Sequence, residues 1–103
     1  MARDTHIYGE VNSKTGMTQI FRAIRHDVAR ARSRPALTEL YRRAGYLITL
    51  TAAPAWQEKF GREASALRQV AKKEFATTAR TINRRAGHIG AEGDYDEKWG
   101  DGR

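Results

Sequence analysis

The longest regular feature of the sequence is a run of apolar and small residues in its second half. From Trp56 to Ile89 these residues recur in steps of four, four and three. This 11-residue repeat, about 3.67 residues per turn, is typical of one face of a nearly straight helix. The spacing predicts a helix over 55–85. Pro54 would open this helix, and Gly61 could bend or break it near its start. Gly87 and Gly90 would end it.

Two shorter apolar stripes precede this helix and also follow a helical period. The first predicts a helix over 18–33, with Thr18 as its N-cap and Pro35 as the residue that stops the chain from continuing. The second predicts a helix over 36–52, in which Gly45 either lets another backbone approach closely or is a tolerated defect. The stripes consist of Met17, Ile20, Phe21, Ile24, Val28 and Ala31, and of Leu37, Leu40, Tyr41, Ala44, Leu47, Ile48 and Thr51.

These elements predict an all-α fold: a small three-helix bundle with a long C-terminal helix and irregular ends. We divide the chain into an N-terminal arm or loop (1–16), a basic helical domain (17–90) and an acidic tail (91–103). The tail is rich in glycine and looks mobile, but its two aromatic residues suggest docking on a surface, such as that of a neighbouring copy. The predicted core consists of Phe21, Ile24, Val28, Leu40, Leu47, Ile48, Phe60, Leu67, Phe75 and Ile82.

Length and composition restrict the class of protein. A chain of 103 residues makes one small domain, and the absence of cysteine excludes disulfides, Cys-ligated metals and a thiol nucleophile. No apolar run approaches the roughly 20 residues of a membrane span. The polar N-terminus, with Asp4 and Glu10, does not resemble a signal peptide. We therefore expect a soluble, cytoplasmic protein that makes no use of a membrane.

The positive charge is concentrated in the helical part. Residues 17–90 hold fifteen Lys and Arg against five Asp and Glu, a net charge of +10, whereas residues 91–103 carry −3. On the long helix a row of cations lies opposite the apolar face, and on the first helix Arg22 and Arg30 do the same. A solvated charged face is the simpler interpretation, but such a row also fits the phosphates of a nucleic acid, bound without regard to sequence. The predicted phosphate-binding residues are Lys59, Arg62, Lys73, Arg80, Arg84, Arg22 and Arg30.

Nothing in the sequence argues for catalysis. The three histidines, His6, His26 and His88, have no partner at a useful spacing, and the common hydrolase, P-loop and dinucleotide motifs are absent. The acidic residues of the tail lack the spacing of a calcium loop. We expect a protein that is not an enzyme, with no catalytic residue, cofactor or metal.

Three classes of function remain open. The first is a non-catalytic helical subunit that binds RNA or DNA backbone within a larger ribonucleoprotein assembly. The second is a protein–protein interaction module without nucleic acid, antitoxin-like or a secreted helical hairpin; the segment Trp56–Gly61 lacks the Trp-x-Gly turn of such hairpins. The third is a small DNA-binding regulator. The predicted last helix is longer than the recognition helix of a helix-turn-helix protein, which counts against this class.

The chain resembles, in size, helix content, basic charge and lack of cysteine, the small helical subunit of multi-subunit (class 1) CRISPR effector complexes. The resemblance covers residues 17–90 and the cations Arg62, Lys73, Arg80 and Arg84, and no sequence motif accompanies it. It implies a role in antiviral defence, with several copies stacked along larger protein subunits and in contact with guide RNA or displaced target DNA. The acidic tail would then suit head-to-tail contact between copies.

Overall fold

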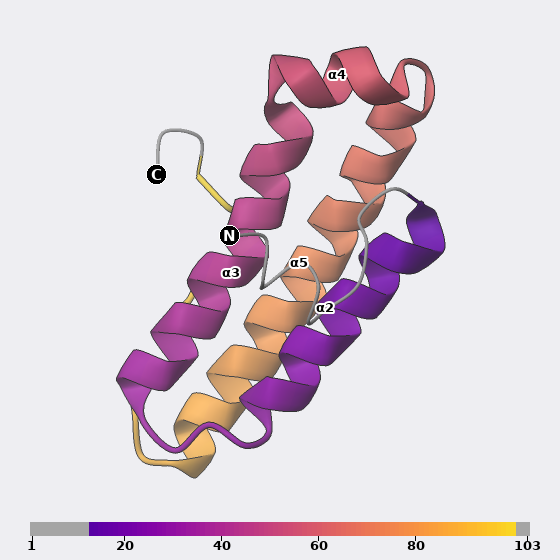
Figure 1. Cartoon of the computed structure of the whole chain (residues 1–103). Helices are drawn as coiled ribbons and strands as arrows, with labels where there is room; N and C mark the ends of the chain where they lie inside the picture. The colour runs from indigo at the N-terminus through magenta and orange to yellow at the C-terminus, as the bar shows by residue number, and fades with distance from the viewer. Residues whose placement is uncertain (1–12, 101–103) are drawn as a thin grey trace.

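The computed structural model describes residues 13–100, and within them all regular structure is α-helical. Helices α2 and α5 run in the same direction and α3 runs opposite to both (Figure 1). The short α4 crosses one end of the bundle between α3 and α5. No helix of the described part is long and apolar enough to cross a membrane. The helices are α2 (Lys14–Val28), α3 (Arg34–Ala52), α4 (Pro54–Phe60) and α5 (Glu63–His88).

Serine caps start α2 and α3, and both starts differ from the prediction. Ser13, not Thr18, is the N-cap of α2, because its side chain accepts a hydrogen bond from the Gly16 amide at 2.9 Å. Most of the predicted arm 1–16 lies outside the described residues, and residues 14–16 already belong to the helix. Ser33 caps α3 in the same way, and Pro35 lies in its first turn, where the missing amide hydrogen costs nothing.

The core confirms the apolar stripes with one exception. Nine of the ten predicted core side chains are buried, and those of Phe21, Phe75 and Ile82 are at most 1% exposed. Phe60 is only partly buried, because it lies on α4 at the end of the bundle; its ring packs at a tilt against that of Trp56, with ring centroids 4.3 Å apart. Helix α5 packs against both α2 and α3 more extensively than these two pack against each other. It is therefore the central support of the molecule.

The predicted long helix is divided in two. Gly61 has a φ of 53°, a left-handed conformation that glycine adopts without strain, and it ends α4 before α5 begins at Glu63. The remaining 26 residues of α5 span about 39 Å at 1.5 Å per residue. The break occurs at the residue that the sequence marked for a bend, and it turns α4 away from the axis of α5.

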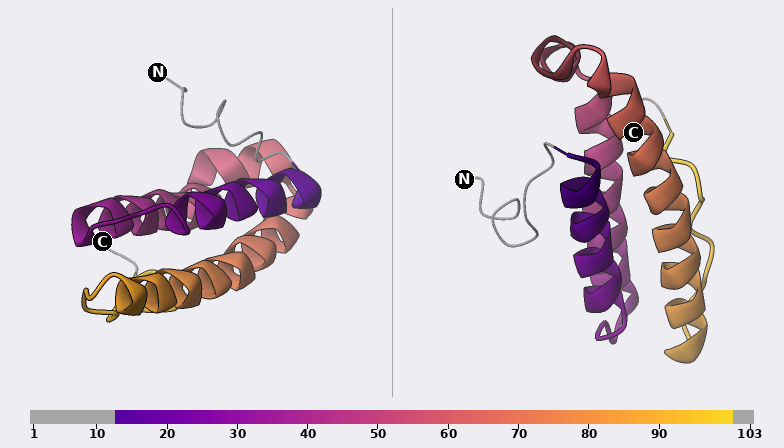
Figure 2. Two further views of the ribbon diagram at one scale, coloured as in Figure 1. Left: turned by 90° about the horizontal axis from the view of Figure 1, so that it is seen from below. Right: turned by 90° about the vertical axis from the view of Figure 1, so that its right-hand side faces the viewer.

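The chain reverses after α5. Gly90 has a φ of 73°, and the amide of Ala91 donates to the carbonyl of Ala86 at 2.8 Å, the pattern of a Schellman motif. Residues 91–100 then run back along α5 as an extended segment, on the side of α5 away from α2 (Figure 2, right). We call these ten residues the tail strap. Residues 91–100 are thus ordered against their own chain, in contrast to the mobile segment expected from composition, and the last three residues of the predicted tail lie outside the described residues.

Candidate nucleic-acid interface

The alignment of α2 with α5 is set by two links between the helices. Arg25 forms a 3.0 Å ion pair with Glu74 and donates to the Thr78 hydroxyl at 3.0 Å. Near the C-terminal ends of both helices, the Arg85 Nε donates to the Ala31 carbonyl at 2.9 Å. Because the helices are parallel, these links bring Arg22 on α2 within about one turn of the level of Lys73 on α5, and Arg30 of Arg84.

Lys and Arg side chains from both helices, together with His26, gather on one solvent-exposed side of this pair. At 100° per residue, Arg22 and His26 project from α2 to the same side as Lys73 and Arg84 from α5. All are exposed, and so is Arg30, just beyond the end of α2. Along α5 the cations extend over about 16 Å. We call this surface the α2–α5 face; its members are Arg22, His26, Arg30, Lys73 and Arg84.

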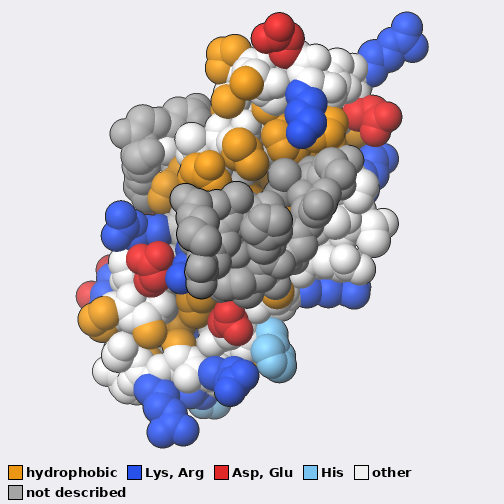
Figure 3. All heavy atoms as spheres, viewed as in Figure 1, with side chains coloured by type: hydrophobic (Ala, Val, Ile, Leu, Met, Phe, Trp, Pro, Cys, Tyr) orange, Lys and Arg blue, Asp and Glu red, His pale blue; other side chains and the backbone are white. Residues whose placement is uncertain are grey.

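The α2–α5 face carries little negative charge. Two carboxylates neighbour its members in sequence: Asp27 follows His26 and is partly buried, and Glu74 follows Lys73 and is held by Arg25, with the side chains of that pair only 19% exposed. Lys, Arg and His side chains also gather at the end of the molecule where α2 and α5 terminate (Figure 3). Neither Lys73 nor Arg84 has an ion pair among the described residues. The positive charge of this face is therefore available to an external anion.

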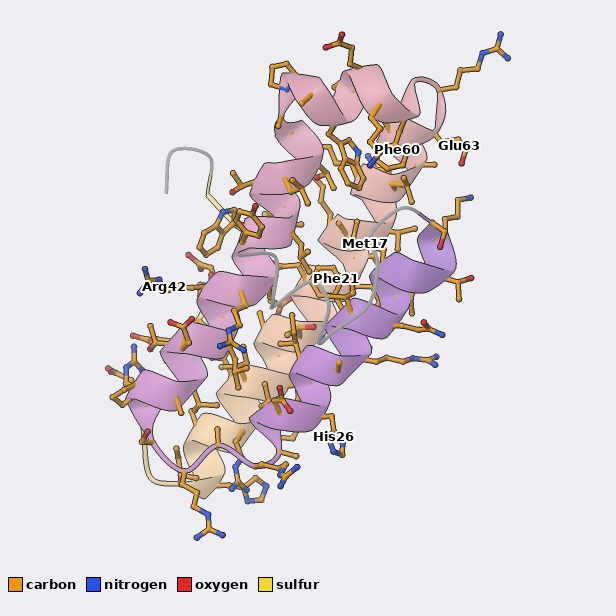
Figure 4. All side chains as sticks on the ribbon, viewed as in Figure 1. Met17, Phe21, His26, Arg42, Phe60 and Glu63 are labelled. Atoms are coloured by element: carbon orange, nitrogen blue, oxygen red, sulfur yellow. The ribbon has the colours of Figure 1, made fainter. Side chains whose placement is uncertain are left out.

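Two of the predicted phosphate-binding residues lie elsewhere. Lys59 belongs to α4 and Arg62 to the turn that follows it, so the break at Gly61 separates them from the cations of α5. Their sequence neighbours Phe60 and Glu63 lie at the opposite end of the bundle from His26 (Figure 4). The single stripe expected from an unbroken helix is consequently not formed, although both residues are exposed.

Arg80 occupies the expected exposed position on α5 but already has an anionic partner. Its guanidinium forms a 2.8 Å ion pair with Glu97 of the tail strap, and it also donates to the Thr77 hydroxyl. Each of the paired side chains is about half exposed, at 51%. Arg80 thus marks the border between the α2–α5 face and the surface covered by the strap.

The strap fills a groove between α3 and α5 with aromatic side chains. The ring of Tyr95 lies 4.9 Å and that of Trp99 5.5 Å from the ring of Tyr41, centroid to centroid, and Trp99 also meets Phe75 edge-on at 5.9 Å. Trp99 covers Gly45 so closely that a Cβ added at this glycine would lie 2.3 Å from the indole. The glycine inside α3 is therefore needed for the approach of a side chain. The surface on which these aromatics dock belongs to the same chain, and not, as expected, to a neighbouring copy.

Hydrogen bonds fix the register of the strap in this groove. The Asn83 side chain pairs with the backbone of Tyr95 in both directions, accepting from its amide at 2.9 Å and donating to its carbonyl at 2.8 Å. The Tyr95 hydroxyl lies 2.6 Å from that of Thr38, and the Trp99 indole donates to Thr49 at 3.0 Å. A side-chain amide that mimics a peptide group holds one position of the strap, while the aromatics fill the groove on either side of it.

Arg34 clasps the beginning of the strap. Its guanidinium pairs with Asp94 at 2.8 Å, donates to the Glu92 carbonyl, and lies 4.8 Å from the centroid of the Tyr95 ring. The hydrogen bond to Asp94, opposed by desolvation and supported by the charges of Asp94 and Glu92, raises the pKa of Arg34 above its ordinary value. A cation at a helix N-terminus opposes the helix dipole, so the acidic strap neutralises an otherwise unfavourable position.

Several other basic residues are structural. Arg68 donates to the Ile48 carbonyl and to the Thr51 hydroxyl, both at 3.2 Å, and so ties α5 to the end of α3. Arg25 and Arg85 link α5 to α2 and to the loop after it. Sequence reasoning missed these roles, because side chains of the same type at neighbouring helix positions differ only in what the fold places opposite them.

The described residues include no group of three or more His, Asp or Glu side chains placed to hold a metal ion. Comparison with models of protein families, with curated proteins and with solved structures finds no match to this chain. The chemistry of its surface, a set of available cations on one side of α5 and a strap of acids and aromatics on the other, is the basis for the functional conclusions.

Proposed function

We propose that this chain is a non-catalytic nucleic-acid-binding subunit whose α2–α5 face follows a phosphate backbone. The observation that carries the proposal is the accumulation of exposed cations on that face without acidic partners among the described residues. Arginine is well suited to this role, because its planar guanidinium makes two parallel hydrogen bonds to a phosphate.

The arrangement of cations favours backbone binding over reading of bases. The α2–α5 face carries no aromatic residue on which bases would stack, since the described aromatics lie in the core, on α4, in the tail groove or, for Tyr46, on α3. Lys73 and Arg84 follow the axis of α5, Arg22 lies on α2 near the level of Lys73, and Arg30 lies just beyond the end of α2, near the level of Arg84. Contacts of this kind position a strand without specifying its sequence. RNA and DNA are both suitable ligands.

The assembly in which such a subunit would work is also part of the proposal. A bundle of this size offers one short basic face, so tight binding of a long strand requires further subunits or further copies arranged along the strand. The resemblance to the small subunit of CRISPR effector complexes is one such arrangement, and it stays a prediction. The tail strap gives copy-to-copy contact no specific support, because its aromatic residues dock within the same chain.

Fluorescence anisotropy with a labelled single-stranded oligonucleotide tests the proposal. A variant with Lys73→Gln and Arg84→Gln is expected to lose binding in proportion to the charge removed, with the same loss for every sequence. The matched control removes positive charge elsewhere, with Lys59→Gln and Arg62→Gln, and is expected to bind nearly normally. Equal affinities of the two variants would contradict the proposal and favour a protein-only interaction module.

A further inference from the structure

The tail strap has the chemical character of a short single strand of nucleic acid. Along it, carboxylates and aromatic rings are interspersed: Asp94 precedes Tyr95, and Asp96, Glu97 and Lys98 separate Tyr95 from Trp99. Asp94 and Glu97 meet guanidinium groups at 2.8 Å, and the rings lie at aromatic contact distance from Tyr41. In a bound strand, phosphates take the positions of such acids and bases take those of the rings.

We propose that the groove between α3 and α5 is a second binding site, for single-stranded nucleic acid, which the chain's own tail strap occupies in this structure. The proposal rests on the proposed function, since it assumes that nucleic acid is the ligand of this protein. The groove would bind bases by stacking on its aromatic rings and phosphates by its positive charge. The strap would compete with nucleic acid for this site.

The groove contains the elements that the α2–α5 face lacks. Beneath the strap lie the rings of Tyr41 and Phe75, with centroids 5.3 Å apart, and at its borders stand Arg34 and Arg80. Asn83 presents an amide whose donor and acceptor both bond to the strap and would suit the edge of a base. Stacking on aromatic rings flanked by cations is the usual means of binding single strands without sequence preference.

The ionic contacts of the strap are open to solvent, whereas Tyr95, only 8% exposed and paired with Asn83, holds it from within the groove. The ion pairs are exposed at about half of each side chain, Arg80 with Glu97 at 51% each and Arg34 with Asp94 at 40% and 55%. Exposed pairs of this kind contribute little to stability and are screened by salt. Arg80 also borders the α2–α5 face, so a strand bound on that face reaches the end of the groove and competes with Glu97 for the same guanidinium.

Neutralising the strap tests the inference. The variant Asp94→Asn with Glu97→Gln keeps the shape of the side chains and removes their charge. Its affinity for a fluorescein-labelled oligodeoxythymidylate is expected to rise about threefold to tenfold, since two exposed ion pairs no longer hold the strap. The matched control, Glu58→Gln with Glu63→Gln, makes the same change of net charge at the α4 end. It is expected to gain less than about twofold.

Two additional measurements separate displacement of the strap from a general gain of charge. Adding Arg34→Gln and Arg80→Gln to the neutralised strap is expected to abolish the gain. Tryptophan emission is expected to shift to the red when the oligonucleotide binds, because Trp99 leaves the groove, whereas inorganic polyphosphate, which has no bases to stack, is expected to produce a smaller shift. Circular dichroism confirms that each variant keeps its helices.

The outcomes distinguish this inference from the proposed function. A gain no larger than that of the charge-matched control, or a gain that survives the loss of Arg34 and Arg80, overturns the groove site and leaves the α2–α5 face untouched. In a third outcome, Arg22→Gln with Arg84→Gln leaves the binding of the otherwise wild-type protein unchanged, and neutralising the strap in that background still raises the affinity. This outcome supports the groove site and contradicts binding by the α2–α5 face. If no variant binds the oligonucleotide, both proposals are wrong.

Discussion

Two adjoining surfaces of α5 carry the same type of residue in opposite electrostatic states. On the α2–α5 face, Lys73 and Arg84 have no ion pair among the described residues, whereas Arg80, about 20° around the helix from Lys73 at the border with the tail strap, is paired with Glu97 at 2.8 Å. The difference arises because the chain returns along only one side of the helix. A helical position therefore determines whether a cation is exposed, but the course of the tail determines whether its charge is available.

The largest expected effect is a loss of stability on truncating Phe75, a core residue of α5, the helix that supports both the α2–α5 face and the tail strap. Phe75 is 1% exposed, and its ring contacts Tyr41 in the core and Trp99 in the strap. Phe75→Ala is expected to lower the free energy of unfolding by about 3–5 kcal/mol, which urea denaturation measures. Phe60→Ala, at a partly buried position on α4, serves as the control and is expected to cost clearly less. Equal costs would contradict the assignment of α5 as the central support.

A substitution at Gly45 separates the two sides by disturbing only one. In Gly45→Ala the new methyl group would lie 2.3 Å from the Trp99 ring, so the indole has to leave the groove. The expected cost is about 1–3 kcal/mol, partly offset by the better helix propensity of alanine, and tryptophan emission is expected to shift to the red. Binding through the α2–α5 face is expected to persist.

Gly87→Ala is the matched control for that experiment. Nothing lies within 4 Å of a Cβ at Gly87, which is in the last turns of α5. We expect this variant to be slightly more stable than the wild type, by up to about 1 kcal/mol, with unchanged tryptophan emission. If the two glycine variants behaved alike, the close contact between α3 and the strap would be wrong.

The sequence contained the separate signals of the strap but not their connection. Gly45 inside a helix and two aromatic residues in an acidic tail were each unusual, and the structure brings them together across more than fifty residues of chain. The local period of the apolar residues predicted the buried face of α5 because that face depends on neighbours three and four positions away. Docking of the strap depends on contacts between distant segments, which no periodicity encodes.

For the candidate site too, the sequence predicted what depends on local helix geometry and missed what depends on contacts between distant segments. Exposure of all the predicted phosphate-binding residues followed from the helical wheel and is confirmed. The wheel assumed one unbroken helix, so it grouped Lys59 and Arg62 with the cations of α5, from which Gly61 separates them. It also missed Glu97 as the partner of Arg80, because that contact depends on the return of the chain after Gly90.

Asn83 provides a smaller and more local test of the strap. Its side-chain amide satisfies both the amide and the carbonyl of Tyr95. Asn83→Ala is expected to lower the free energy of unfolding by about 1–2 kcal/mol, since the backbone of Tyr95 loses both partners. Hydrogen exchange is expected to accelerate at Tyr95 while the amides in the middle of α2 keep their protection. Unchanged exchange at Tyr95 would show that the strap does not depend on this pairing.

The smallest effect on stability, and the largest effect on nucleic-acid binding, is expected for a substitution on the α2–α5 face. Arg84→Gln removes an exposed side chain without an ion pair in the described structure, so its stability is expected to change by less than about 0.5 kcal/mol. Its affinity for a single strand is expected to fall several-fold. A large loss of stability would indicate that Arg84 has a structural role like that of Arg85.

The salt dependence of binding tests the central claim most directly. About four phosphate contacts, from Arg22, Arg30, Lys73 and Arg84, predict a slope of log K against log salt near −3 for a single strand, at roughly −0.7 per contact. Replacing Arg22 and Arg84 by glutamine is expected to make the slope shallower by about 1.4, equally for every oligonucleotide sequence. A flat salt dependence of the wild type, or an unchanged slope in that variant, would contradict phosphate binding by the α2–α5 face.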